Sequence, residues 1–189
     1  MGVIASDSFN RADGPIGSAD TGQTWVATNV GSTFAIISNQ AGVTSTFAAY
    51  TPCVVQTNVS DCTVSVDITN TEANTGLCFR CIDDSNYWMV LTFGGYLFKN
   101  IAGAFTLVAT GTGGTGTWQA VLSGSSIVVK NNGVVNVTAT DSTNATGTQH
   151  GLVAYSSSTQ RWDNFSVTTP DVFTKRLVIS QAVKRAAFF

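Results

Sequence analysis

The feature that most constrains this chain is a set of short segments in which every second residue is apolar. Between positions 76 and 99 the sequence reads GLCFRCIDDSNYWMVLTFGGYLFK. A period of two is the side-chain period of a β-strand, and it runs through 76–82, 87–93 and 96–99. Residues 83–86 (Asp, Asp, Ser, Asn) and the glycines at 94–95 are turn-forming types. The stretch therefore predicts a β-meander of three antiparallel strands.

The same pattern continues to residue 169 without a helical periodicity. Asn and Gly at 131–133 favour a tight hairpin turn, and Pro52 places its segment at a sheet edge. Roughly a dozen short strands at regular spacing are typical of an antiparallel two-sheet β-sandwich, which is the all-β fold we expect for 1–169. The expected strands cover 34–38, 40–43, 48–56, 62–69, 76–82, 87–93, 96–99, 104–109, 118–122, 125–130, 134–140, 151–155 and 162–168.

The composition excludes some classes of partner. Charged residues make up 11% of the chain, about half the usual share. The net charge of −2 gives no electrostatic basis for binding nucleic acid. No apolar run reaches the length of a membrane span, and the first residues have neither the basic start nor the apolar stretch of a signal peptide. We therefore expect no nucleic acid, no membrane and no export by the general route.

The last twenty residues differ from the rest. Residues 1–169 hold ten acidic and five basic residues, a net charge of −5, whereas 170–189 hold one acidic and four basic residues, a net charge of +3. The strand pattern ends at the same point, which predicts a C-terminal arm that docks on a neighbour. The apolar residues expected at that assembly contact are Phe173, Leu177, Ile179, Val183, Phe188 and Phe189.

Four cysteines lie between positions 53 and 81, and two of them have the spacing of half a zinc site. Residues three apart on a strand face opposite sides, so Cys78 and Cys81 are not expected to share a metal. We expect buried free thiols. A disulfide from Cys62 to Cys78 or Cys81 is the alternative in an oxidising medium.

Three segments resemble the LamG-like, concanavalin A-like jelly-roll domains. They are DSFNRADGPIG followed by TGQTW, then GLCFRCIDDSNYWMVLTF, then GLVAYSSSTQRWDNFSV, within 5–168. The resemblance implies a jelly-roll sandwich of two curved sheets with adjacent first and last strands, whose concave sheet often binds glycans. The opening segment is similar to those of tail and other virion proteins of bacteriophages.

The resemblance and the arm lead to two compatible hypotheses. The first is a structural bacteriophage virion protein, a capsid decoration or minor tail component. It would be made in the host cytoplasm and attached through the arm to other virion proteins or to further copies of itself. The alternative is a carbohydrate-binding module for host-surface glycans.

Aromatic faces and polar side chains bind sugars, and the chain offers two groups of them. The candidates are Arg80, Tyr87, Trp88 and Tyr96 in the meander, and Arg161 and Trp162 near the end. Tyr87 and Trp88 are neighbours, so only one can line a binding face. The alternative is that Trp88 belongs to the core and that Arg80 pairs with Asp67 or Asp83.

Catalysis has less support in the sequence. Glycoside hydrolysis uses two carboxylates across one bond, but Glu72 is the single Glu and no strand offers paired acids on one face. His150, the single His, has no recognisable serine and acid partners. We expect no enzymatic activity, with a hydrolase kept as a third hypothesis.

One metal site follows from the resemblance, since several jelly rolls hold a structural calcium between the first loop and the last strand. Asp7 and Asp163 would come close if those strands pair. Calcium takes six or more oxygen ligands. The alternative is that Asp163 bonds backbone or Arg11. No other cofactor is expected.

Overall fold

The structure, a computed structural model, describes residues 1–29, 33–70 and 74–169. In these ranges the chain forms sixteen β-strands and no helix, so nothing there has the length and apolar character of a membrane-crossing helix. The strands are β1 (Gly2–Asp7), β2 (Gly14–Pro15), β3 (Val26–Ala27), β4 (Phe34–Ile37), β5 (Gln40–Val43), β6 (Thr51–Gln56), β7 (Thr63–Ile68), β8 (Gly76–Asp83), β9 (Asn86–Leu91), β10 (Tyr96–Ile101), β11 (Ala104–Thr110), β12 (Gly116–Ser123), β13 (Ser126–Asn131), β14 (Val134–Thr140), β15 (Gln149–Ala154) and β16 (Arg161–Thr169).

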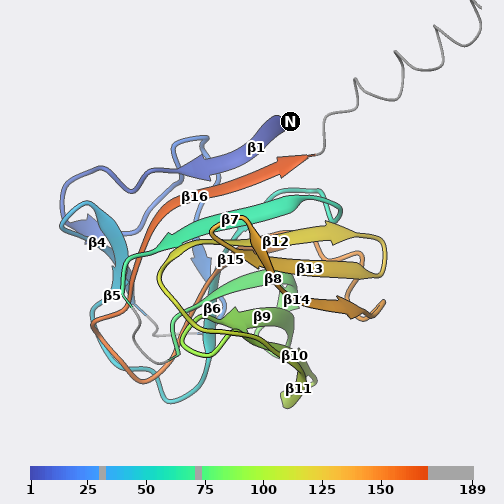
Figure 1. Cartoon of the computed structure of the whole chain (residues 1–189). Helices are drawn as coiled ribbons and strands as arrows, with labels where there is room; N and C mark the ends of the chain where they lie inside the picture. The colour runs from blue at the N-terminus through green and yellow to red at the C-terminus, as the bar shows by residue number, and fades with distance from the viewer. Residues whose placement is uncertain (30–32, 71–73, 170–189) are drawn as a thin grey trace, which may run out of the picture.

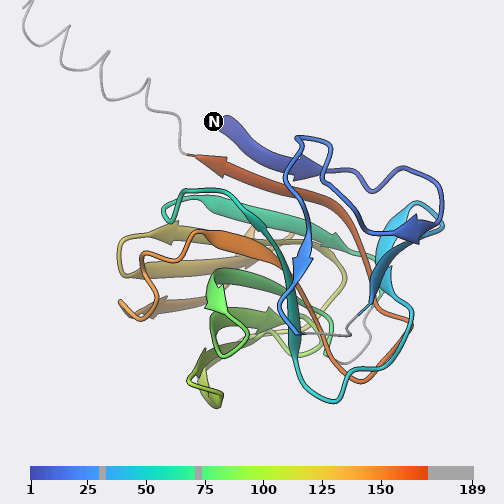
Figure 2. The same ribbon diagram turned by 180° about the vertical axis from the view of Figure 1, so that it is seen from behind.

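The strands form two antiparallel sheets that pack against each other (Figure 1). The nine-stranded sheet has the order β14-β13-β12-β7-β16-β5-β4-β2, and β1 pairs with β16. The seven-stranded sheet has the order β11-β10-β9-β8-β15-β6-β3. The first and last strands lie side by side in Figure 1 and, from behind, in Figure 2, as the resemblance implied. The predicted all-β, two-sheet antiparallel sandwich is confirmed.

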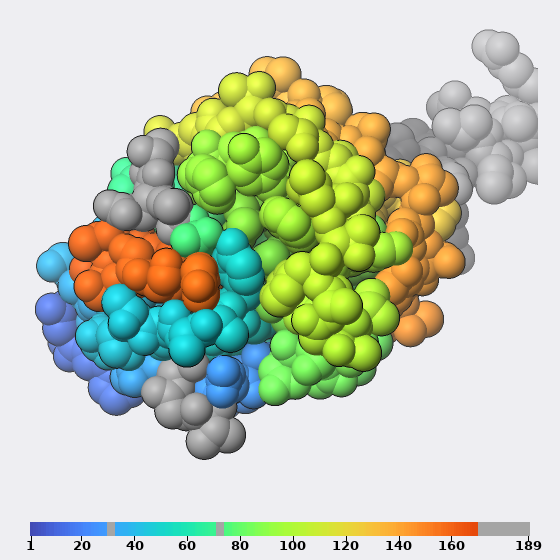
Figure 3. Space-filling model, turned by 90° about the horizontal axis from the view of Figure 1, so that it is seen from below, coloured from blue at the N-terminus to red at the C-terminus, as the bar shows by residue number. Residues whose placement is uncertain are grey.

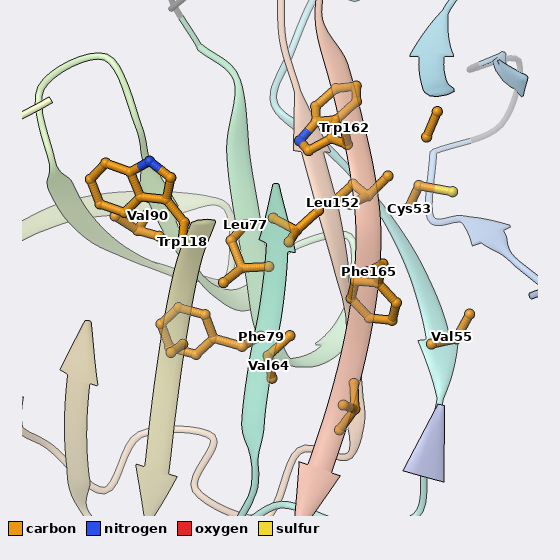
Figure 4. Close-up of a cluster of buried hydrophobic side chains, with 14 of the residues drawn as sticks. Cys53, Val55, Val64, Leu77, Phe79, Val90, Trp118, Leu152, Trp162 and Phe165 are labelled. Carbon is orange, nitrogen blue, oxygen red and sulfur yellow. The ribbon is translucent and has the colours of Figure 1, made fainter. Parts of the chain in front are cut away.

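The core between the sheets is built by the inward-pointing half of each strand. On β7 the residues Val64, Val66 and Ile68 are buried, and those between them are partly exposed. Leu77 and Phe79 of β8 belong to the same cluster (Figure 4). Burying each large apolar side chain contributes about 1.5–3 kcal/mol, so the alternation selects the sandwich.

A second apolar cluster lies on the other side of the seven-stranded sheet. We call this side, which is turned away from the nine-stranded sheet, the outer face. The strand alternation shows the division, because Trp88 and Val90 belong to the core whereas Tyr87 and Met89 belong to the second cluster. Its buried members are Val54, Cys78, Cys81, Tyr87, Met89, Leu91 and Val153.

A β-bulge at Arg80 corrects one sequence prediction. Arg80 has a φ of 50°, in the left-handed region, and the pairing of β8 with β9 shifts register between Phe79 and Asp83. Relative to β15, strand β8 holds one extra residue between Cys78 and Cys81, which turns Cys81 to the same face as Cys78 and not to the opposite face as predicted. All four cysteines are buried and free, as expected.

Some predictions fall outside the described residues. These are the single glutamate, Glu72, and the arm at 170–189 with Phe173, Leu177, Ile179, Val183, Phe188 and Phe189. The arm and its role in assembly stay predictions.

Candidate functional site

Three side chains lie opposite one another across the end of the seven-stranded sheet. Tyr87 of β9 pairs with Asn100 of β10, which pairs in turn with Phe105 of β11. Directly opposite residues of antiparallel strands point to the same face, and Tyr87 belongs to the outer cluster. Asn100 and Phe105 of this row form the floor of a site on the outer face.

Two hairpin turns that are tied together form one wall. Asp84 and Ser85 connect β8 to β9, and Ala102 and Gly103 connect β10 to β11. The amide of Gly103 donates to the carbonyl of Ser85 (3.1 Å), and the amide of Ala102 donates to Oδ1 of Asn86 (3.1 Å). Ala102 and Gly103 both have positive φ (50° and 83°), as a two-residue hairpin turn of this type requires.

The other wall comes from a segment distant in sequence, just before β6. The ring centroid of Tyr50 lies 5.4 Å from that of Phe105 and 4.8 Å from that of Tyr155. Its hydroxyl donates to Oδ1 of Asn74 (2.8 Å), and its carbonyl accepts from the hydroxyl of Tyr87 (3.3 Å). Burial, and then the nearby Tyr155, raise the pKa of Tyr50, so it stays a neutral phenol. These contacts hold Tyr50 in place over the floor.

The walls and floor enclose a pocket of about 230 Å³. In Figure 3 the cyan chain around residue 50 borders the yellow-green β10–β11 hairpin on this face. Phe105 is 44% exposed, while Asn100 is 2% exposed and its Oδ1 has no hydrogen-bond partner in the part of the chain described. Leaving a buried acceptor unpaired costs about 1–3 kcal/mol, so a ligand hydroxyl that contacts Oδ1 would recover that cost. The lining residues are Asn29, Ala49, Tyr50, Asp84, Ser85, Asn100, Gly103 and Phe105.

Three aromatic residues predicted to bind sugar are buried. Trp88 and Trp162 lie in the core, where their indole nitrogens donate to the carbonyls of Thr143 and Gly76, both at 2.9 Å. Tyr87 points to the outer face but has no exposed surface. A fully buried ring offers no face to a sugar, so these three predictions are corrected. The alternative that Trp88 belongs to the core is right.

Arg80 is also fully buried, which corrects its prediction as a sugar contact. Its Nη2 donates to the carbonyl of Gly124 (2.6 Å) and lies 3.8 Å from the carboxylate of Asp61. Neither expected partner, Asp67 or Asp83, pairs with it. Its Nε and Nη1 have no partner among the described residues. Burial lowers the pKa of Arg80, and the charge of Asp61 opposes that shift.

His150 is a buried histidine with its hydrogen bonds made. Its Nδ1 accepts from the backbone amide of Arg80 (3.2 Å), which assigns the proton to Nε2. Nε2 then donates to the carbonyl of Val59 (2.9 Å). Burial lowers the pKa of His150 to about 4. Both ring nitrogens of this neutral residue are therefore engaged within the fold.

Tyr96 and Arg161 stay at the surface but on different sheets. Tyr96 is partly exposed, packs on the outer cluster and lies 5.1 Å from the ring of Phe93. It is four residues before Asn100 on β10, or about 13 Å along the strand. Arg161 begins β16 and donates to the carbonyl of Ser158 (3.0 Å). The structure brings Tyr96, but not Arg161, onto the face of the pocket.

The carboxylate of Asp7 is saturated by protein donors. Its oxygens accept from both terminal nitrogens of Arg11 (2.6 and 3.1 Å), from the amide of Phe9 (2.9 Å) and from Nε1 of Trp25 (2.8 Å). Burial raises the pKa of Asp163. No group of three His, Cys, Asp or Glu side chains within the described ranges fits a metal ion. Calcium at Asp7 and Asp163 stays a prediction, and Arg11 pairs with Asp7 and not with Asp163.

Sequence reasoning missed the pocket residues Tyr50, Asn100 and Phe105. The alternation of β10 places Asn100 on the face of Tyr96, which was a usable signal. The approach of Tyr50 to Phe105 depends on a loop path, for which the sequence offers no pattern.

No family model matches the chain, and no curated protein sequence matches it. Among solved structures the chain is similar to a carbohydrate-binding module, CBM66, from Bacillus subtilis, with a TM-score of 0.58 and 19% identity over 77% of this chain and 92% of that one. It is also similar to a sialidase, with a TM-score of 0.56 and 15% identity over 90% of this chain and 19% of the sialidase chain. The likeness shows the jelly-roll fold. It lends no support to the bacteriophage setting, which stays a prediction.

Proposed function

We propose that this protein is a carbohydrate-binding module and that the outer-face pocket between Tyr50 and Phe105 is its binding site. The observation that carries the proposal is an exposed aromatic ring beside a buried amide oxygen that lacks a partner. The ring of Phe105 can pack on the apolar face of a sugar while Oδ1 of Asn100 accepts from a hydroxyl. The fold shared with CBM66 supports this proposal.

The lining of the pocket favours binding without catalysis. Its described residues carry one carboxylate, that of Asp84, whereas glycoside hydrolysis uses a pair. The volume of about 230 Å³ is below the roughly 300 Å³ at which sites for drug-sized ligands begin. We therefore propose that one sugar ring is held and released unchanged.

A glycan array followed by calorimetric titration of the best ligand tests the proposal. Phe105→Ala should weaken binding about tenfold, equal to about 1.4 kcal/mol, because the stacking face is lost. Leu107→Ala is the matched control, since Leu107 lies two residues along the same strand and is 50% exposed. The proposal fails if no glycan binds the wild type, or if both variants lose affinity equally.

A place on a virion is compatible with this proposal, because a displayed domain can bind host glycans. That role rests on the sequence of residues 170–189. Deleting 171–189 should abolish incorporation into particles, and normal incorporation of the truncated chain would refute it.

A further inference from the structure

Two polar groups in the lining of the pocket are acceptors with unused capacity. Oδ1 of Asn100 has no partner, as described above. Asp84 is exposed, and its Oδ1 accepts from the hydroxyl of Ser85 (3.0 Å), while its Oδ2 accepts no hydrogen bond from the described residues. Hydroxyl donors of a ligand would satisfy both groups.

The turn that carries Asp84 is held by its neighbour. The carboxylate of Asp83 accepts from the amide of Ser85 (2.8 Å) and from the side-chain nitrogen of Asn86 (2.9 Å). Asp83 is thus engaged inside the turn, whereas Asp84 presents its charge at the pocket.

Among the described residues that line the pocket, no Lys or Arg side chain balances the charge of Asp84. Lys99 is next to Asn100 on β10, but it lies opposite Trp88 and so points to the other face. Its Nζ is 2.7 Å from the carboxylate of Asp141. The pocket is therefore locally negative.

We infer that this pocket takes an uncharged sugar residue through its hydroxyl donors and discriminates against acidic sugars. The inference rests on the proposed carbohydrate-binding function and adds the class of sugar. The carboxylate of a uronic or sialic acid a few ångströms from Asp84 would be repelled, and it would offer acceptors where donors are needed. The combined effect should be about tenfold or more in affinity at low ionic strength, and smaller in added salt.

The test uses the full chain and a panel of neutral glycans, each paired with its uronic-acid or sialylated counterpart. Affinities are measured at low ionic strength for the wild type, Asp84→Asn and Asp13→Asn. Asp13 is an exposed carboxylate beside β2 in the nine-stranded sheet, so its variant makes the same change of charge far from the pocket.

We expect wild type and Asp13→Asn to bind neutral glycans at least tenfold more tightly than the acidic counterparts, and Asp84→Asn to reduce that ratio below threefold. Acidic glycans that bind the wild type as tightly as neutral ones would overturn the inference and leave the proposed function standing. A ratio that Asp84→Asn leaves unchanged would do the same. Failure of every glycan to bind would remove the proposed function, and the inference with it.

Discussion

Replacing Asp7 by alanine should be among the most destabilising single changes in the first strand. Asp7 is 1% exposed and accepts four hydrogen bonds, two from Arg11, one from the amide of Phe9 and one from the indole of Trp25. The carboxylate thus fixes the loop after β1 and anchors Trp25, whose ring lies 4.9 Å from that of Phe165 on β16.

The magnitude follows from what the substitution leaves unpaired. Removing one partner of a buried ion pair costs about 3–5 kcal/mol. Arg11 is 29% exposed at its side chain and also donates to the carbonyl of Ile16, so part of its charge stays compensated. The indole N–H of Trp25 adds about 1–3 kcal/mol when it is left without an acceptor. Because these effects overlap, we expect a loss of about 4 kcal/mol in the free energy of unfolding.

Guanidinium chloride unfolding, followed by tryptophan fluorescence, measures the loss. Asp20→Ala is the matched control, since its exposed carboxylate accepts one backbone amide, that of Ser8 (2.8 Å), and should cost about 1 kcal/mol. Asp7→Asn, which keeps an acceptor oxygen, should fall between the two and serves if Asp7→Ala does not fold. A loss for Asp7→Ala no larger than that for Asp20→Ala would refute the assignment of Asp7 as the organising acceptor.

Three further predictions concern groups away from the pocket. The pKa of His150 is about 4 in the fold against 6.5 normally, so the stability that the neutral ring contributes is complete above pH 6.5. As the pH falls from 6.5 toward 4, the free energy of unfolding should decrease by about 3 kcal/mol. In His150→Gln the free energy of unfolding should vary less with pH over that range, and an unchanged slope would contradict this. Burial alone would raise the pKa of Asp141, but its hydrogen bond from Lys99 (2.7 Å) helps lower that pKa to about 2. In Lys99→Met the pKa of Asp141, followed by NMR titration, should rise toward 3.8. An unchanged pKa would show that the Lys99–Asp141 pair is not the cause of the shift. Gly151→Ala places a methyl group against the carbonyl of Cys53 inside the sheet, so we expect a loss of about 3 kcal/mol or failure to fold, and wild-type thermal stability would show that β15 shifts freely.

The strands were predictable because burial on one face imposes a period of two. The turns at 83–86 and 94–95 were predictable from residue type, and the strands found at Gly76–Asp83, Asn86–Leu91 and Tyr96–Ile101 confirm that meander. The burial of Trp88 opposite Tyr87 follows from the same alternation, once the sheet has a core on one side.

The site was less predictable, because it depends on features that are not periodic. The bulge at Arg80 is one residue with positive φ, and nothing in the residue type requires it there. It reverses the side on which Cys81 lies. The pocket needs Tyr50 to meet Phe105, two residues 55 positions apart that are joined through a loop path and not through strand register.

The pairing of β1 with β16 has a geometric consequence for any larger assembly. Gly2 lies opposite Thr169, so the first and last strands of the sandwich begin and end next to each other in the nine-stranded sheet. The pocket lies on the outer face of the other sheet, and Figure 1 shows β1 and β16 at the top with β10 and β11 at the bottom. A domain whose two ends are adjacent is suited to insertion into another protein. It could be spliced into a surface loop of a host protein, or tethered by either end, with its pocket pointing away from the point of attachment.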